Sequence, residues 1–215
     1  MRVGARRDAW PRGGRVAEGF TILTVCTGNI CRSPLAERLL ANALADLPQV
    51  RVSSAGTHAV VGHAMDEAAQ LVALRLGVSD PGRHVARQLT AAMLAESDLV
   101  LALSRDNRRF IVELNPRVAR RVFTLREFGR LASATTDDDL RAEIAPDPVT
   151  LTDRLKIAAA SVVLARTELS LLTTPEDDDV IDPIGGGPEV LDRSTEQLLP
   201  AIAGTVGLFR RVCEL

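Results

Sequence analysis

The chain has 215 residues, of which 46% are apolar and 25% charged, enough apolar content to bury one substantial core. Its formal net charge of −2 shows no excess of basic residues of the kind that binds nucleic acid, and no apolar run is long enough to cross a membrane. We therefore expect neither a nucleic-acid partner nor a membrane partner. Three cysteines without a secretory disulfide framework indicate a reducing cytoplasm.

The first 19 residues are rich in arginine and glycine and contain no apolar stretch of the kind found in signal peptides. We expect residues 1–19 to be a flexible tail, with docking to an acidic partner as the alternative. Residues 20–215 are expected to form a single domain.

Strand and helix patterns alternate after the tail, which is typical of a parallel sheet covered by helices on both faces. Strands are expected at 20–25, 50–54, 99–103 and 122–124. Helices are expected at 34–47, 68–76, 89–95, 107–114 and around 198–209. The fold class is therefore α/β, with an open, mostly four-stranded parallel sheet. Ligands of such sheets bind outside the carboxyl ends of the strands, where the first expected strand ends.

The segment 129–179 departs from this alternation and is interpreted as an insertion. It contains acidic runs at 137–139 and 176–179 around an expected helix at 155–172, capped by Thr152 or Asp153. The simplest interpretation is a helix packed against the sheet edge between solvated turns. A lid or a partner surface is the alternative, because the segment leads directly into residue 182.

The residues at 25–34 read V-C-T-G-N-I-C-R-S-P and lie between the first expected strand and the first expected helix. Ser33 suits the N-cap of that helix, and Pro34 suits its first turn. Unpaired backbone N–H groups and the positive end of the helix dipole at this point bind an oxyanion and favour a thiolate at Cys26. Arg32 offers a planar fork for two phosphoryl oxygens. The stretch therefore predicts a phosphate site with a nucleophile at its floor.

A purely structural cysteine and a zinc site are the two weaker interpretations of this stretch. A buried cysteine beside an arginine that pairs with a carboxylate would need none of this strand–loop–helix context. Zinc is disfavoured, because no second pair of Cys or His stands at ligand spacing, so we expect no metal.

The loop resembles the signature loop of the low-molecular-weight protein tyrosine phosphatases. Three more segments resemble that family in the same order: S-S-A-G-T at 53–57, H-V-A-R-Q at 84–88 and D-P at 182–183. The resemblance covers 20–131 and 180 to the end. It implies a flavodoxin-like fold of the phosphotyrosine phosphatase I type. It also implies a phosphomonoester hydrolase that acts on phosphoproteins through a cysteinyl-phosphate intermediate, without a cofactor.

The resemblance implies that Cys26 is the nucleophile, that Arg32 binds phosphate and that Asp182 is the general acid. The implied phosphate-binding loop consists of Thr27, Gly28, Asn29, Ile30, Cys31 and Arg32. Asn29, Ser33 and His84 are implied to support the loop, and Cys31 to be a redox partner of Cys26. The chemistry itself requires an acid, because a phosphate ester leaves poorly unless its bridging oxygen is protonated. Asp147, which also precedes a proline, is the competing candidate.

The substrate is less well determined by the residues. In the tyrosine phosphatases of the family that this chain resembles, aromatic residues usually line the substrate pocket. At the corresponding places this chain has His58, Ala59, Val60 and Ile184. Ile30 favours phosphotyrosine, because the related arginine phosphatases tend to carry threonine there. A protein arginine phosphatase, a thiol-dependent arsenate reductase and a non-enzymatic phosphate-sensing module remain alternatives. The expected partners are a phosphorylated protein or peptide, and phosphate as product or inhibitor.

Overall fold

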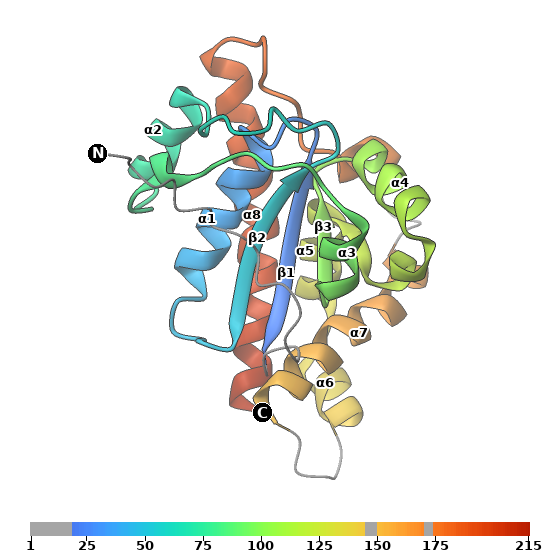
Figure 1. The fold of residues 1–215 in the computed structure, drawn as a ribbon. Coiled ribbons are helices and arrows are strands. Elements are labelled where there is room, and N and C mark those ends of the chain that lie inside the picture. The colour runs from blue at the N-terminus through green and yellow to red at the C-terminus, as the bar shows by residue number, and fades with distance from the viewer. Residues whose placement is uncertain (1–18, 145–149, 170–173) are drawn as a thin grey trace, which may run out of the picture.

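A four-stranded parallel sheet with the strand order β2-β1-β3-β4 forms the centre of the protein (Figure 1). The structure is a computed structural model that describes residues 19–144, 150–169 and 174–215. The strands are β1 (Phe20–Cys26), β2 (Val50–Gly56), β3 (Leu99–Ala102) and β4 (Val122–Thr124). The α/β class and the four-stranded parallel sheet predicted from the sequence are confirmed.

Helices cover both faces of this sheet. They are α1 (Arg32–Ala43), α2 (Glu67–Arg75), α3 (Ala91–Glu96), α4 (Arg105–Leu114), α5 (Leu125–Ala134), α6 (Asp137–Ile144), α7 (Leu151–Leu169) and α8 (Pro188–Glu214). Along β1, Ile22 joins the core beneath α1, α5 and α8, whereas Leu23 and Val25 join the core beneath α3 and α4. Figure 1 shows α8 behind the sheet and α3 in front of it. The central strand β3 (Leu-Val-Leu-Ala) is apolar and buried throughout because both of its faces are covered, whereas the edge strand β2 carries Arg51, Ser53 and Ser54.

The carboxyl ends of β1 and β2 lie side by side at one edge of the sheet. Cys26 is in register with Gly56, and the N–H of Thr57 donates to the carbonyl of Cys26 over 2.9 Å. A Cβ atom on Gly56 would lie 2.5 Å from the carbonyl oxygen of Thr27, so only glycine permits this approach. The loop that follows β1 is thereby held against the end of β2.

Helix α1 begins at Arg32, with Cys31 at its N-cap position and no side-chain capping hydrogen bond. The predicted cap at Ser33 is therefore wrong. The hydroxyl of Ser33 lies 3.0 Å from the Sγ of Cys26, so it is used beneath the loop instead of at the end of the helix.

The acidic run at 137–139 forms the first turn of α6, not a solvated turn as predicted. The carboxylate of Asp139 accepts the N–H of Thr136 at 2.9 Å, and negative charge is favoured at a helix N-terminus. Helix α5, which contains Gly129, and helix α6 were both missed from the sequence.

Helix α7 is capped by Thr150, whose hydroxyl accepts the N–H of Asp153 at 3.2 Å, so the predicted cap at Thr152 or Asp153 is wrong. Leu155 is fully buried, and Lys156 lies 3.7 Å from Asp98 at the amino end of β3. Helix α7 thus packs at the end of the sheet remote from Cys26 (Figure 1), which favours a packed helix over a lid.

Three predictions fall on residues outside the described ranges: most of the tail (1–18), the alternative acid Asp147, and the expected end of the insertion helix at 170–172. Among the described helices, none combines the length and the apolarity that crossing a membrane requires.

Candidate active site

Cys26, the predicted nucleophile, lies at the last position of β1 with 3% of its surface exposed. The backbone N–H of Asn29 donates to its Sγ over 3.3 Å, and the Ser33 hydroxyl lies 3.0 Å away. The Ser33 oxygen accepts a hydrogen bond from Asn29 Nδ2, and its own proton faces two acceptors, the Cys26 sulfur at 3.0 Å and the Ala55 carbonyl oxygen at 3.4 Å. The Asn29 N–H and the Ser33 hydroxyl therefore both contact the sulfur from inside the loop.

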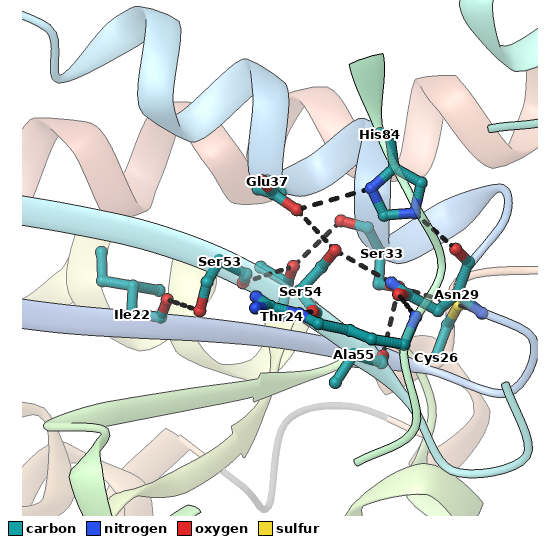
Figure 2. A network of polar contacts seen from close by, with 11 residues as sticks. Ile22, Thr24, Cys26, Asn29, Ser33, Glu37, Ser53, Ser54, Ala55 and His84 are labelled. Atoms are coloured by element: carbon teal, nitrogen blue, oxygen red, sulfur yellow. Dashed lines mark hydrogen bonds and ion pairs between the residues drawn. The ribbon is translucent and has the colours of Figure 1, made fainter. Parts of the chain in front are cut away.

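Asn29 organises the loop from within (Figure 2). Its backbone is left-handed, with φ at 55°, and its side chain is fully buried. The side-chain amide donates 2.9 Å hydrogen bonds to the hydroxyls of Ser33 and Ser54, and its Oδ1 accepts the N–H of Arg87 at 2.9 Å. One side chain thus ties the loop to β2 and to the segment that carries the H-V-A-R-Q motif.

A second layer of polar residues lies under this amide (Figure 2). The Ser54 hydroxyl donates to the carboxylate of Glu37 on α1, and His84 Nε2 contacts the carbonyl oxygen of Asn29 at 2.7 Å. That carbonyl can only accept, so the Nε2 of His84 carries the proton. Burial lowers the pKa of His84, against the opposing effects of the Asn29 carbonyl and of Glu37, 3.9 Å from Nδ1. His84 therefore contacts the backbone of the loop, as expected for a supporting residue.

Arg32 and Asp182 meet at the mouth of the loop. The Arg32 side chain is only 6% exposed; its Nη1 donates to the carbonyl of Val180 at 3.0 Å, and its Nη2 forms an ion pair with the Asp182 carboxylate. Asp182 is 48% exposed, and its other oxygen accepts the N–H of Ile184 at 3.2 Å. The structure thus brings the predicted acid, Asp182, to the predicted phosphate-binding residue, Arg32. The Asp182 carboxylate occupies part of the guanidinium group that a phosphoryl group would bind.

Cys31 follows on the same loop and is 4% exposed. Burial, reinforced by the nearby Asp66, raises the pKa of Cys31 to about 12, so it is a neutral thiol at neutral pH. Ile30 and Cys31 also line an apolar cavity of about 860 Å³ between α2 and the start of α8.

The structure adds four residues that the sequence analysis did not place in the site: Glu37, Ser54, Arg87 and Asn107. Ser54 and Arg87 stand inside the quoted motifs, so a signal for them was present. Asn107 has no local signal. Its Nδ2 lies 3.3 Å from the hydroxyl of Thr27 because β3 pairs with β1 and brings the start of α4 to the loop.

An aromatic contact lies at the rim of the site. His58 packs edge-on against Phe110 of α4, with ring centroids 5.2 Å apart. Closer to the loop the side chains are aliphatic, since Ile30 and Val60 flank Gly28.

Residues 21–151 match the family of low molecular weight phosphotyrosine protein phosphatases. The chain belongs to this family. The match includes the loop from Cys26 to Arg32, whereas Asp182 lies beyond it. The family membership inferred from the loop and the three shorter motifs is confirmed.

Two curated proteins illustrate the similarity within this phosphatase family. The probable low molecular weight protein-tyrosine-phosphatase AmsI of Erwinia amylovora is 48% identical over 98 residues, which span 46% of this chain and 65% of AmsI. The phosphatase Etp of Escherichia coli K12 is 47% identical over 98 residues, spanning 46% of this chain and 64% of Etp. The aligned part thus covers slightly less than two thirds of these relatives.

Solved structures agree over a longer stretch. The crystal structure of the AmsI tyrosine phosphatase has a TM-score of 0.59 at 28% identity, covering 92% of this chain and 96% of that chain. The YwlE arginine phosphatase from Geobacillus stearothermophilus has a TM-score of 0.60 at 26% identity, covering 87% and 91%. The fold alone therefore does not separate a tyrosine from an arginine phosphatase.

Proposed function

We propose that the protein is a phosphomonoester hydrolase that removes phosphate from phosphotyrosine in proteins. The observation that carries this proposal is the meeting of three groups, two from the loop and one from the segment before α8. Cys26 Sγ faces the Asn29 amide, the Arg32 guanidinium is buried beside the loop, and the Asp182 carboxylate contacts that guanidinium. These are the nucleophile, the anion ligand and the acid that phosphoryl transfer without a metal needs.

In the first step, the phosphate dianion displaces the Asp182 carboxylate from the fork of Arg32. Asp182, once released from Arg32, takes up a proton from solvent. Cys26 Sγ then attacks phosphorus, the S–P bond forms as the bond to the tyrosyl oxygen breaks, and Asp182 donates its proton to that oxygen. Arg32 and the loop amides stabilise the charge on the equatorial oxygens in the transition state.

In the second step, Asp182 acts as a base toward water. The water oxygen attacks phosphorus, the S–P bond breaks, inorganic phosphate leaves, and Cys26 returns as a thiolate held by Asn29 N–H and Ser33. Phosphate, as the product, is expected to inhibit by binding the same loop.

The preference for tyrosine is supported by aliphatic side chains at the mouth. Ile30 and Val60 flank Gly28, and Ile184 follows the acid, half exposed at 53%. Such walls bury a phenyl ring, although without aromatic stacking. The arginine phosphatase remains the alternative, because YwlE resembles this chain as closely in fold as AmsI does. We place the protein in a reducing compartment, the cytoplasm, because all three cysteines are free.

Phosphate release from matched phosphotyrosine and phosphoarginine peptides tests the proposal, with arsenate reduction measured alongside. We expect turnover of the phosphotyrosine peptide and its loss in Cys26→Ser, with phosphate binding retained. Faster release from phosphoarginine would make the protein an arginine phosphatase. Turnover by Cys26→Ser at the wild-type rate would refute the cysteinyl-phosphate mechanism.

A further inference from the structure

A second cavity, with a volume of about 470 Å³, lies between helices α5 and α8, separate from the loop of Cys26. Helical periodicity explains its walls. Arg126 and Arg130 stand four residues apart on α5, and Arg193 and Gln197 stand four residues apart on α8, so each helix presents one row of side chains to the other. The two helices are in backbone contact beside these rows, because a Cβ atom on Gly129 would lie 2.5 Å from Ala201.

The side chains that line the cavity carry a net positive charge, which Asp178 offsets in part by pairing with Arg130. Three arginines line it, and Glu196 is the one acidic residue among its walls. Arg193 forms no ion pair or hydrogen bond with any residue that the structure describes. Arg130 pairs with Asp178 at 2.9 Å, but its buried Nε has no partner within the same ranges. The guanidinium groups therefore retain N–H donors that are not used within the protein. Two such donors of one guanidinium group can bind two oxygens of a phosphate.

The walls of the cavity also hold the segment that leads to the proposed acid. Arg130 binds the side chain of Asp178, in the 3₁₀ turn η4 (Pro175–Asp178), and Arg126 donates to the carbonyl of Asp179 over 2.8 Å. Gln197 accepts the N–H of Ile181 at 2.8 Å. Asp182 follows directly. An anion that engages Arg126 and Arg130 competes with the contacts that position this segment.

We propose that this cavity binds a compact phosphorylated polyanion, such as a diphosphate group. We also propose that occupancy of the cavity changes the position of the Asp182 carboxylate. The second half of the proposal rests on the proposed function, whereas the binding itself does not. An anion with several oxygens suits the site because three guanidinium groups, which come from two helices, line one cavity. Pro200 and Ala201 add apolar surface to the same cavity, against which a small carbon skeleton attached to the anion can pack.

Pyrophosphate is the probe for binding, followed by two-dimensional ¹H–¹⁵N NMR of the full chain at constant ionic strength. We expect two groups of amide signals to shift, one from 27–32 and one from 126–133 and 193–201. Arg193→Gln should weaken pyrophosphate binding at the cavity, followed by the signals of 126–133 and 193–201, about five- to tenfold, as losing one charge-assisted contact does. Binding at the loop, followed by the signals of 27–32, should stay unchanged. Arg51→Gln, at an exposed arginine on β2, is the matched control and should alter binding at neither place.

Shifts confined to residues 27–32 would overturn the site. It would also be overturned if sodium chloride reproduced the shifts at 126–133 and 193–201, or if Arg51→Gln weakened pyrophosphate binding there as much as Arg193→Gln does. Hydrolysis of a phosphotyrosine peptide tests the coupling. Pyrophosphate at Arg126 and Arg130 should change kcat at least twofold, whereas competition at the loop raises KM alone. In Arg193→Gln the change in kcat should need five- to tenfold more pyrophosphate. An unchanged kcat with the cavity occupied would refute the coupling, and an inactive wild type would refute the proposed function while the NMR result stands.

Discussion

Replacement of Asn29 tests how far a single side chain holds the loop in its active form. Asn29→Gly removes three hydrogen bonds, to Ser33, Ser54 and the N–H of Arg87, while glycine still accepts the left-handed backbone. At about 1 kcal/mol for each hydrogen bond, the loss is about 3 kcal/mol in the free energy of unfolding. Asn29→Ala adds a Cβ at φ 55°, which costs about 1–2 kcal/mol more.

Urea denaturation of the wild type, both variants and Asn42→Ala measures these differences. Asn42 is exposed on α1 and serves as the matched control, for which we expect no loss of stability. Activity should fall further than stability suggests, because the N–H of Asn29 contacts the Cys26 sulfur. Misplacing one such backbone donor costs about 10²–10³ in kcat. Equal stability of wild type and Asn29→Gly would refute the role of the side chain, and equal stability of the two variants would refute the backbone argument.

Further outcomes are expected for Asp182, for Cys31 and for two glycines. Asp182→Asn should lose about 10²–10⁴ in kcat on a phosphotyrosine peptide and less on an activated aryl phosphate, because an acid matters most for a basic leaving group; steady-state kinetics measures this. After brief peroxide treatment, dithiol should restore the wild type but restore Cys31→Ser poorly. Because the pKa of Cys31 is raised to about 12, its thiolate fraction, and with it the rate of disulfide formation, should rise about tenfold per pH unit from pH 7 to 9. Gly129→Ala should cost about 1–3 kcal/mol in urea denaturation, because its methyl group would lie 2.5 Å from the backbone of Ala201. Gly207→Ala, with open space around its Cβ, should stabilise the same fold by about 0.5–1 kcal/mol.

Each of these outcomes has a result that contradicts it. Equal losses for all leaving groups would move the acid away from Asp182. Equal recovery of wild type and Cys31→Ser would reduce Cys31 to a packing role. A Gly129→Ala protein as stable as the wild type would mean that α5 and α8 separate at little cost.

The loop was predictable from the sequence because its function is local. Cys26, Asn29 and Arg32 are close neighbours in the chain, and a strand before them with a helix after them suffices to aim backbone N–H groups at an anion. The central strand β3 was predictable for a similar reason, since a strand buried on both faces is a short apolar run between turns. The ends of β1, β2 and β3 shifted by one or two residues, and β4 lies where it was predicted.

Other features depended on which elements the fold brings together. Ser33 reads as a helix cap, but its hydroxyl faces Cys26 because β1 and α1 converge at the loop. Asn107 reaches Thr27 because β3 pairs with β1, and Arg130 reaches Asp178 because η4 packs against α5. The partners in these contacts are separated by 7 to 80 positions in the sequence. A side chain's own sequence neighbourhood sets its conformation and its chemistry, but the choice of a distant partner is made by strand order and helix packing, which no short pattern encodes.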